Sequence, residues 1–351
     1  MADLVAQGIV PAAGAAELET VTETFRLRIT PEMQTALHSA GVARQFLPRA
    51  EELTLRPEEL ADPIGDTAFS PAPGLTHRYP DRVILAVTQT CEVYCRFCFR
   101  RETVGRPGRC PRGSDAGAGL HRPHPRDPRG DSDRGDPLSL SPRRLGAVID
   151  RLQAIPHLLQ VRLHSRVPVV APDRMDDAML AVLDRDLPVH LVIHTNHPDE
   201  LTPAARAALR RLNRAGIAMF SQSVLLRGVN DDADTLEALF RQLLANRVKP
   251  YYLHHCDLAK GTSHFRTTIA EGRALMAELR RRLSGLALPT YVLDIPGGAG
   301  KVPLTLPMPR PRAMPGPSPT ALARSTAITI RSAARPPVFF AAPFSFLICP
   351  V

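Results

Sequence analysis

The sequence has no hydrophobic run long enough to cross a membrane. A membrane-spanning helix needs roughly 18 consecutive apolar residues, and none of the 351 residues belongs to such a stretch. The first residues, MADLVAQGIVPAAGAAELE, also lack the basic start and apolar core of a signal peptide. These two absences predict a cytoplasmic protein with no membrane partner.

Cysteine is scarce and unevenly placed. The chain has six cysteines, and three of them, Cys91, Cys95 and Cys98, lie within eight residues. A disulfide framework would distribute its cysteines over a small secreted chain, so this pattern argues against one. A cluster in a chain expected in the cytoplasm favours a metal site instead.

Acidic residues are missing where the basic residues gather. Residues 305–351 carry five arginines and no acid, and residues 105–134 carry seven arginines against four aspartates. These two segments supply +8 of the net charge of +9. Because the rest of the chain is near neutral, its basic character does not mark a binding face, and we predict no nucleic-acid partner.

Short apolar strands alternate with amphipathic helices along most of the chain, which predicts βαβ units and a parallel sheet. Six strands are expected, at 82–90, 158–165, 189–196, 217–226, 249–255 and 289–296. Helices are expected at 141–155, 174–186, 202–216, 231–247 and 268–285, with Gly216 and Gly285 as caps of the third and fifth. Residues 20–62 also look helical, and one helix there begins at Thr30 and Pro31. Catalytic groups should lie where parallel strands end.

The cysteine cluster follows the first expected strand and has the spacing C-x₃-C-x₂-C. Tetrahedral zinc takes four ligands, whereas a four-iron cluster can be held by three thiolates with one iron left open. With Phe97 before the third cysteine, the motif resembles the radical S-adenosylmethionine superfamily, in which the open iron binds S-adenosylmethionine. A zinc loop or buried free thiols remain the alternatives.

Six successive segments narrow the resemblance. CRFCFRRETVG, VRLHSRVPVVAPDR, HTNHPDELT, SQSVLLRGVND, PYYLHHCDLAKGTSHFRT and LDIPGGAGKVPL are similar to blocks of the lysine 2,3-aminomutase family. The resemblance covers roughly residues 50–104 and 135–304. It implies an α/β fold, a partial (β/α)₆ radical S-adenosylmethionine barrel over residues 81–304 with an N-terminal helical extension over residues 1–80. Within the barrel we expect residues 105–134 to be aberrant and disordered, and residues 305–351 to form an irregular or disordered tail.

The resemblance also implies an activity, the conversion of L-lysine to β-lysine by migration of the amino group. The implied cofactors are a 4Fe-4S cluster on Cys91, Cys95 and Cys98, S-adenosylmethionine and pyridoxal phosphate, with no structural zinc. The implied partners are the substrate L-lysine and a reducing protein such as flavodoxin or ferredoxin, and a homo-oligomer is left open. A β-lysine-forming enzyme that serves elongation-factor modification is an alternative.

Several site residues follow from the matching segments. Lys301 closes a glycine-rich loop, and the resemblance implies that its amine forms the Schiff base with pyridoxal phosphate. Asp257 and Asp294 each follow an apolar strand, and a pair of carboxylates suits the ammonium group of lysine. Arg100 matches the arginine that binds the substrate carboxylate. The remaining implied cofactor-binding residues are Gly135, Asp136, Arg166, His194, Asn196, His197, Gln222, Ser223, Arg227, Asn230, Gly297, Gly298 and Gly300.

One segment breaks the family pattern. The resemblance implies a strand that ends in Thr-Gly-Gly-Asp-Pro, but residues 126–137 read RDPRGDSDRGDP and keep only the last three. Codons for residues 127–135 read one base later can encode Ile-Arg-Glu-Val-Ile-Leu-Thr-Gly, which is such a strand and turn. We therefore hypothesise two compensating frame changes, near residues 105–109 and near Gly135. An inactive, frame-damaged family member is accordingly an alternative to the active enzyme.

Resequencing of the gene over this segment tests the frame hypothesis directly. We expect one inserted or deleted base near each of the two positions. An uninterrupted read in the present frame would contradict the hypothesis.

Overall fold

A single nine-stranded sheet organises the residues that the computed structural model describes, which are 2–11, 14–101, 104, 135–304 and 344–348. Its strands lie in the order β1-β2-β9-β3-β4-β5-β6-β7-β8. The bounds are β1 (Leu75–Tyr79), β2 (Arg82–Leu85), β3 (Leu158–Ser165), β4 (Val189–His194), β5 (Ala218–Leu225), β6 (Lys249–His255), β7 (Thr290–Ile295), β8 (Gly300–Pro303) and β9 (Phe344–Ile348). All neighbours from β2 to β7 pair in parallel, and the two edge strands β1 and β8 are antiparallel.

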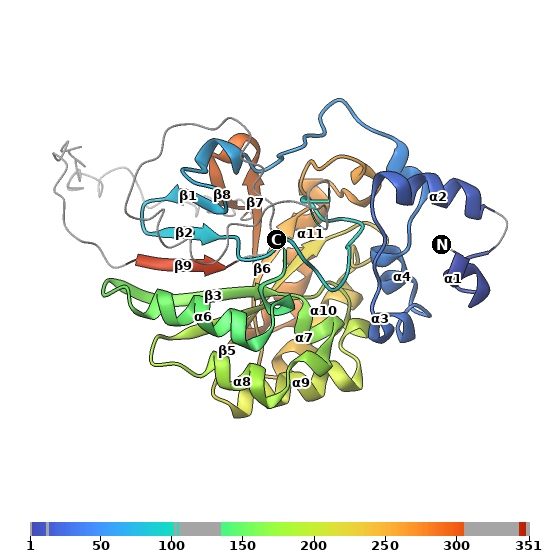
Figure 1. Ribbon diagram of the computed structural model, residues 1–351. Coiled ribbons are helices and arrows are strands. Elements are labelled where there is room, and N and C mark those ends of the chain that lie inside the picture. Colours follow the sequence, from blue (N-terminus) through green and yellow to red (C-terminus); the bar gives the residue numbers. More distant parts are fainter. Residues whose placement is uncertain (1, 12–13, 102–103, 105–134, 305–343, 349–351) are drawn as a thin grey trace, which may run out of the picture.

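Helices connect the parallel strands, as Figure 1 shows, and a separate group of N-terminal helices lies to one side of the sheet. The connecting helices are α6 (Pro142–Gln153), α7 (Val167–Val170), α8 (Asp177–Leu183), α9 (Pro203–Arg214), α10 (Ala233–Ala245) and α11 (Ile269–Arg282). The N-terminal helices are α1 (Ala2–Ala6), α2 (Ala15–Thr24), α3 (Pro31–Thr35) and α4 (Ala40–Phe46). Short 3₁₀ turns are η1 (Ala50–Leu53), η2 (Thr67–Phe69), η3 (Pro137–Ser139), η4 (Pro172–Arg174), η5 (Pro198–Glu200), η6 (Ser263–Phe265), η7 (Gly285–Ala287) and η8 (Pro296–Gly298).

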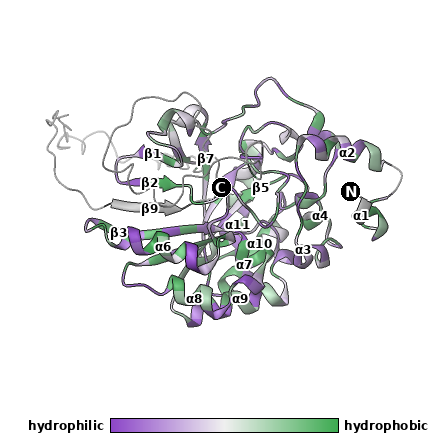
Figure 2. Ribbon diagram, viewed as in Figure 1, coloured by the Kyte–Doolittle hydropathy of each residue, from purple (hydrophilic) through white to green (hydrophobic). Residues whose placement is uncertain are grey.

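Local sequence explains where these helices begin and which face they bury. In α6, Pro142 occupies the first turn, and Leu145, Ile149 and Leu152 repeat at helical spacing and are buried. Figure 2 shows hydrophobic and hydrophilic residues alternating along this helix. Helix α11 starts with a capping box in which Thr268 and Glu271 satisfy each other's backbone N–H groups. Buried apolar residues of the connecting helices pack with those of the strands, and together they form the main hydrophobic core.

The predicted α/β barrel is confirmed, since the six expected strands appear in order as β2 to β7. The first is shorter than expected and ends at Leu85. Beyond Leu85, the backbone oxygens of Thr88 and Thr90 pair with the turn at Gly135 and Asp136 instead of with a neighbouring strand. Gly135 N donates to Thr88 O at 2.5 Å, and Asp136 N donates to Thr90 O at 2.9 Å.

The place between β2 and β3 holds a strand that the sequence did not predict. Strand β9, Phe344–Ile348, pairs in parallel with β2 at three positions and with β3 at five, as Figure 1 shows. The expectation that residues 305–351 are irregular throughout is therefore wrong for these five residues. The expected disorder of residues 105–134 lies outside the described residues.

Two smaller expectations also need correction. The N-terminal extension is not purely helical, because β1 lies within residues 1–80 and pairs with β2. Gly285 does not cap α11, which ends at Arg282; this glycine begins the turn η7 instead. Gly216 does follow α9, and its φ of 77° is the left-handed conformation expected there. Within the described residues, no helix has the length and apolar character to cross a membrane.

Removing β9 should expose the facing edges of β2 and β3. Each backbone hydrogen bond contributes about 1 kcal/mol of net stability. We therefore expect the free energy of unfolding of a chain that ends at Pro343, measured with urea, to be several kcal/mol lower than that of the full chain. A chain ending at Ile348 is the matched control and should unfold like the full chain. Equal midpoints for the two truncations would contradict the role of β9.

Candidate active site

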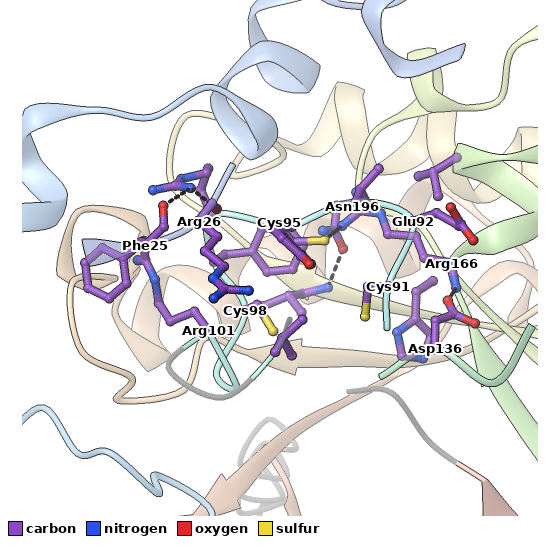
Figure 3. Close-up of a pocket in the computed structure, with 18 of the residues that line it drawn as sticks. Phe25, Arg26, Cys91, Glu92, Cys95, Cys98, Arg101, Asp136, Arg166 and Asn196 are labelled. Atoms are coloured by element: carbon purple, nitrogen blue, oxygen red, sulfur yellow. Dashed lines mark hydrogen bonds between the residues drawn. The ribbon is translucent and has the colours of Figure 1, made fainter. Parts of the chain in front are cut away.

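A pocket at the strand ends gathers the three clustered cysteines. They lie on the loop after β2, together with Asp136, Arg166, His194, Asn196 and Gln222 from the following segments. Figure 3 shows the thiols of Cys91, Cys95 and Cys98 beside Asp136, Arg166 and Asn196. The pocket thus brings together eight of the residues that the sequence predicted for the site.

Burial disfavours the thiolate form of all three cysteines, and Arg166 offsets this only in part at Cys95. Burial raises the pKa of all three, with Cys98 reaching about 11, and the pKa of Cys91 is raised further by Asp136 and by the other two cysteines. No group of three or more His, Cys, Asp or Glu side chains in the described ranges converges closely enough to hold one metal ion. A four-iron cluster binds its thiolates through different iron atoms, so it does not require such convergence.

The surviving Gly-Asp-Pro turn lies against the cysteine loop. A Cβ atom on Gly135 would lie 2.4 Å from the backbone N and O of Thr90, so only glycine fits there. The carboxylate of Asp136 accepts hydrogen bonds from Ser165 Oγ at 2.7 Å and from Arg166 N at 2.7 Å. Burial raises the pKa of Asp136 to about 6. The turn therefore connects the cysteine loop to the end of β3.

Arg166 links the cysteine loop to two buried side chains that the sequence analysis did not single out. Its guanidinium donates to Cys95 Sγ at 2.9 Å, to Glu200 Oε2 at 2.6 Å and to Gln45 Oε1 at 2.7 Å. Glu200 and Gln45 are fully buried. Since Gln45 belongs to α4, the N-terminal extension contributes directly to this site.

A second buried carboxylate holds the cysteine loop from the other side. Glu52 Oε2 accepts from Arg96 Nη2 at 2.5 Å and also from Arg101, and all three side chains are at most 4% exposed. Arg96 also donates to the backbone oxygens of Phe25 and Arg26. The loop is thus fixed to η1 and to the end of α2.

Lys301 lies in a separate cluster of charged groups at the ends of β6, β7 and β8. It faces Asp294 across the antiparallel pair of β7 and β8, and its Nζ donates to Asp294 Oδ2 at 2.6 Å. His254 Nδ1 lies 3.2 Å from Lys301 Nζ and 3.1 Å from Asp294 Oδ2. The structure therefore brings the predicted Lys301 and Asp294 into direct contact.

The two predicted carboxylates of this cluster differ in their electrostatics. Burial raises the pKa of Asp257 to about 7, and the charge of Asp294 raises it as well. Burial acts in the same direction on Asp294, but hydrogen bonds and charges from His254 and Lys301 outweigh it and lower that pKa. Asp294 is therefore paired with Lys301, whereas at Asp257 the charges of Lys301, Arg100 and Arg78 lower the pKa by less than burial and Asp294 raise it.

The glycine-rich loop before Lys301 has the backbone that glycine allows. Gly297, Gly298 and Gly300 all have positive φ, between 78° and 104°. A Cβ atom on Gly298 would also lie 2.3 Å from Cε2 of Phe69, so the loop packs directly on η2.

Arg100 does not lie free at the site. Its guanidinium and that of Arg78 both bind the buried carboxylate of Asp66, which follows the loop Ile64–Gly65. A substrate carboxylate would therefore compete with Asp66 for Arg100.

The other predicted residues divide into two groups. Gln222, Ser223 and Asn230 are buried on or after β5, where Ser223 Oγ donates to Thr195 O at 2.6 Å. By contrast, Arg227 is half-exposed and pairs with Glu271 at 2.9 Å, away from the pocket. His197 caps η5 by accepting from Asp199 N.

Sequence reasoning missed the residues that hold the site residues in place. Glu200 and His254 lie inside the segments HTNHPDELT and PYYLHHCDLAKGTSHFRT, which were recognised only as blocks. Gln45, Glu52 and Asp66 lie in the N-terminal extension, which gave no chemical pattern. What these residues share is a buried polar side chain, and burial can be seen only in the folded structure.

Glu52→Gln should test the anchoring of the cysteine loop. Removing this charge leaves the buried Arg96 and Arg101 without a counter-ion, so we expect a loss of about 3–5 kcal/mol in the free energy of urea unfolding. The neighbouring Glu51→Gln is the control, because the Glu51 side chain is 49% exposed, and it should cost less than about 0.5 kcal/mol. Equal effects of the two substitutions would count against the anchor.

Comparison with known proteins gives several similar sequences, although no family model matches the chain. The L-lysine 2,3-aminomutase of Fusobacterium nucleatum is 38% identical, with 80% of this chain and 68% of that protein covered. The L-lysine 2,3-aminomutase of Acetoanaerobium sticklandii is 39% identical, with 80% and 70% covered. The glutamate 2,3-aminomutase of Clostridioides difficile is 37% identical, with 82% and 69% covered.

Among solved structures, a radical SAM methyltransferase from Sphaerobacter thermophilus is similar over 62% of this chain and 68% of its own chain, at 18% identity and a TM-score of 0.42. This likeness is too weak to support an argument about the fold or the function. The relatives confirm the resemblance drawn from the six segments: the chain belongs to the lysine 2,3-aminomutase family.

Proposed function

We propose that this chain converts L-lysine to β-lysine by moving the amino group from the α-carbon to the β-carbon. The single observation that carries the choice of lysine is the acidic pair Asp257 and Asp294 beside Lys301. Family membership alone leaves the substrate open, because a glutamate 2,3-aminomutase is also among the similar proteins.

The acidic pair favours a cationic substrate side chain. Burial and the charge of Asp294 raise the pKa of Asp257 to about 7 and outweigh the opposing charges of Lys301, Arg100 and Arg78. The ε-ammonium of lysine would add a further cation beside this carboxyl group, whereas the side-chain carboxylate of glutamate would add a further repulsion. Arg100 would bind the α-carboxylate once it exchanges its ion pair with Asp66.

The chain's own residues fit the three cofactors of the proposed reaction. Cys91, Cys95 and Cys98 would hold the 4Fe-4S cluster, whose cations would offset the cost of three neighbouring buried thiolates. Lys301 and the loop of Gly297, Gly298 and Gly300 would hold pyridoxal phosphate. The residues proposed for S-adenosylmethionine are Gly135, Asp136, Arg166, His194, Asn196 and His197. Those proposed to line pyridoxal phosphate are Gln222, Ser223, Arg227 and Asn230.

Unpaired buried atoms support a polar occupant inside the barrel. His164 Nε2 and Thr195 Oγ1 have no hydrogen-bond partner in the described part of the chain, although both residues are at most 4% exposed. Leaving such atoms without partners costs free energy. A bound polar cofactor or its water would supply the missing partners.

The cofactors together supply radical chemistry and a carrier for the migrating nitrogen. The protein's part is to hold the reacting groups in place and to exclude water, so that a radical is not quenched. Burial of Arg166 and His194 and the apolar packing of Phe97 on Phe265 serve this exclusion. A reducing protein such as flavodoxin or ferredoxin would deliver the electron.

The proposed activity is tested on the chain as written. After anaerobic reconstitution with iron and sulfide, we expect β-lysine to form from L-lysine when pyridoxal phosphate, S-adenosylmethionine and a reductant are present. Asp257→Asn should raise the KM for lysine by about tenfold or more, because it removes one partner of the ammonium. L-glutamate should not be converted.

The controls separate loss of cofactor from loss of fold. Cys98→Ala should lose iron, whereas Cys256→Ala should keep it, because Cys256 is buried among apolar side chains outside the cysteine loop. Conversion of glutamate rather than lysine would overturn the substrate. No turnover by the chain as written, together with turnover by a frame-restored version, would identify this chain as the inactive alternative.

A further inference from the structure

The ammonium group of Lys301 has two close polar neighbours with different chemistry. Asp294 Oδ2 lies 2.6 Å from Nζ, and His254 Nδ1 lies 3.2 Å from it. Both neighbours are anchored on strands, β7 and β6, and are at most 10% exposed at their side chains. A carboxylate, an imidazole and an amine in mutual contact form a nucleophile, a base and a group that orients the base.

We propose that His254 is the base that takes a proton from Lys301 Nζ when this amine reacts with the aldehyde of its cofactor, and that Asp294 holds the resulting imidazolium. This proposal rests on the proposed function, in which Lys301 binds pyridoxal phosphate. It adds a catalytic role for His254, which contacts the reacting nitrogen directly.

The distances allow this transfer. Lys301 Nζ lies 3.2 Å from His254 Nδ1 and 3.4 Å from Nε2, and Nδ1 lies 3.1 Å from Asp294 Oδ2. In the tautomer whose Nδ1 carries no proton, this nitrogen can accept a proton from Nζ, and once protonated it can donate to Asp294 Oδ2. The step balances without a further reactant. One of the three Nζ protons passes to His254, a carbon–nitrogen bond forms, and the other two protons leave with the carbonyl oxygen as water.

The surroundings of His254 favour a neutral imidazole before the transfer. Burial lowers the pKa of His254 to about 4, and the charge of Lys301 lowers it further, while Asp294 acts in the opposite direction. Neutral groups also face this region: Tyr252, whose ring lies 5.7 Å from the imidazole, and the buried His164 and His194, whose pKa values are lowered mainly by burial. Two further charged groups act on the neighbours of His254: Asp257 on Lys301 and Asp294, and Arg162 on Tyr252 and His164. Loss of the Lys301 charge during the reaction would remove the repulsion by which this charge disfavours protonation of His254.

The neighbouring histidine provides a matched control. His255 follows His254 on β6, but its Nδ1 lies 2.8 Å from the hydroxyl of Tyr291 and has no contact with Lys301. Substitution of either histidine removes the same ring from the same strand. Only His254 should affect the chemistry of Lys301.

The test follows the capture of pyridoxal phosphate by the full chain at pH 7. Borohydride reduction fixes the bound cofactor, and peptide mass identifies the site among the three lysines of the chain, Lys249, Lys260 and Lys301. We expect His254→Ala to slow capture at Lys301 by about 100-fold, and added imidazole to restore at least a tenth of the normal rate. His255→Ala should capture within about twofold of the unmodified chain.

Each outcome decides between the roles. Normal capture by His254→Ala, or no acceleration by imidazole, would overturn the proposal, because a purely structural histidine is not replaced by a base from solution. If His254→Ala does not fold, His254→Gln should still capture slowly while melting like the unmodified chain; normal capture by this variant would equally overturn the proposal. Failure of the unmodified chain to capture the cofactor at Lys301 would instead overturn the proposed function, and this inference with it.

Discussion

The site depends on the pairing of buried charges. Glu52 holds Arg96 and Arg101, Glu200 holds Arg166, and Asp66 holds Arg100 and Arg78, each inside the protein. A buried ion that loses its partner is far more costly than an exposed one, so each pair fixes its arginine to one position. Because these arginines lie on or beside the cysteine loop, the ion pairs determine the shape of the pocket.

The same pairs join segments that are far apart in the sequence. Gln45 and Glu52 come from the N-terminal extension, yet they contact Arg166 at the end of β3 and Arg96 within the cysteine loop. The extension is therefore part of the site and not an appendage to the barrel. Strand β9 also joins distant segments, through backbone pairing. It lies between β2, which leads into the cysteine loop, and β3, which leads to Arg166, and it pairs with both.

Neutral histidines occupy the region between the cysteine pocket and Lys301. His164 Nδ1 on β3 lies 3.4 Å from His194 Nε2 on β4, and the charge of Lys301 adds to burial in lowering the pKa of both rings. Burial keeps these rings uncharged and provides hydrogen-bonding groups without adding net charge. The cations that act on Asp257 and Asp294 are therefore Lys301 and, at Asp257, also Arg100 and Arg78.

The sequence by itself determined the family, the six parallel strands and the cysteine loop, because each follows from a local pattern of residues. Only the tertiary structure decided which partners hold these residues: Glu200 and Gln45 for Arg166, Asp66 for Arg100, His254 for Lys301, and β9 for the sheet between β2 and β3. The physical reason is that a hydrogen bond or ion pair between residues more than 30 positions apart leaves no periodicity or spacing in the sequence. It arises from burial, and burial is a property of the whole fold.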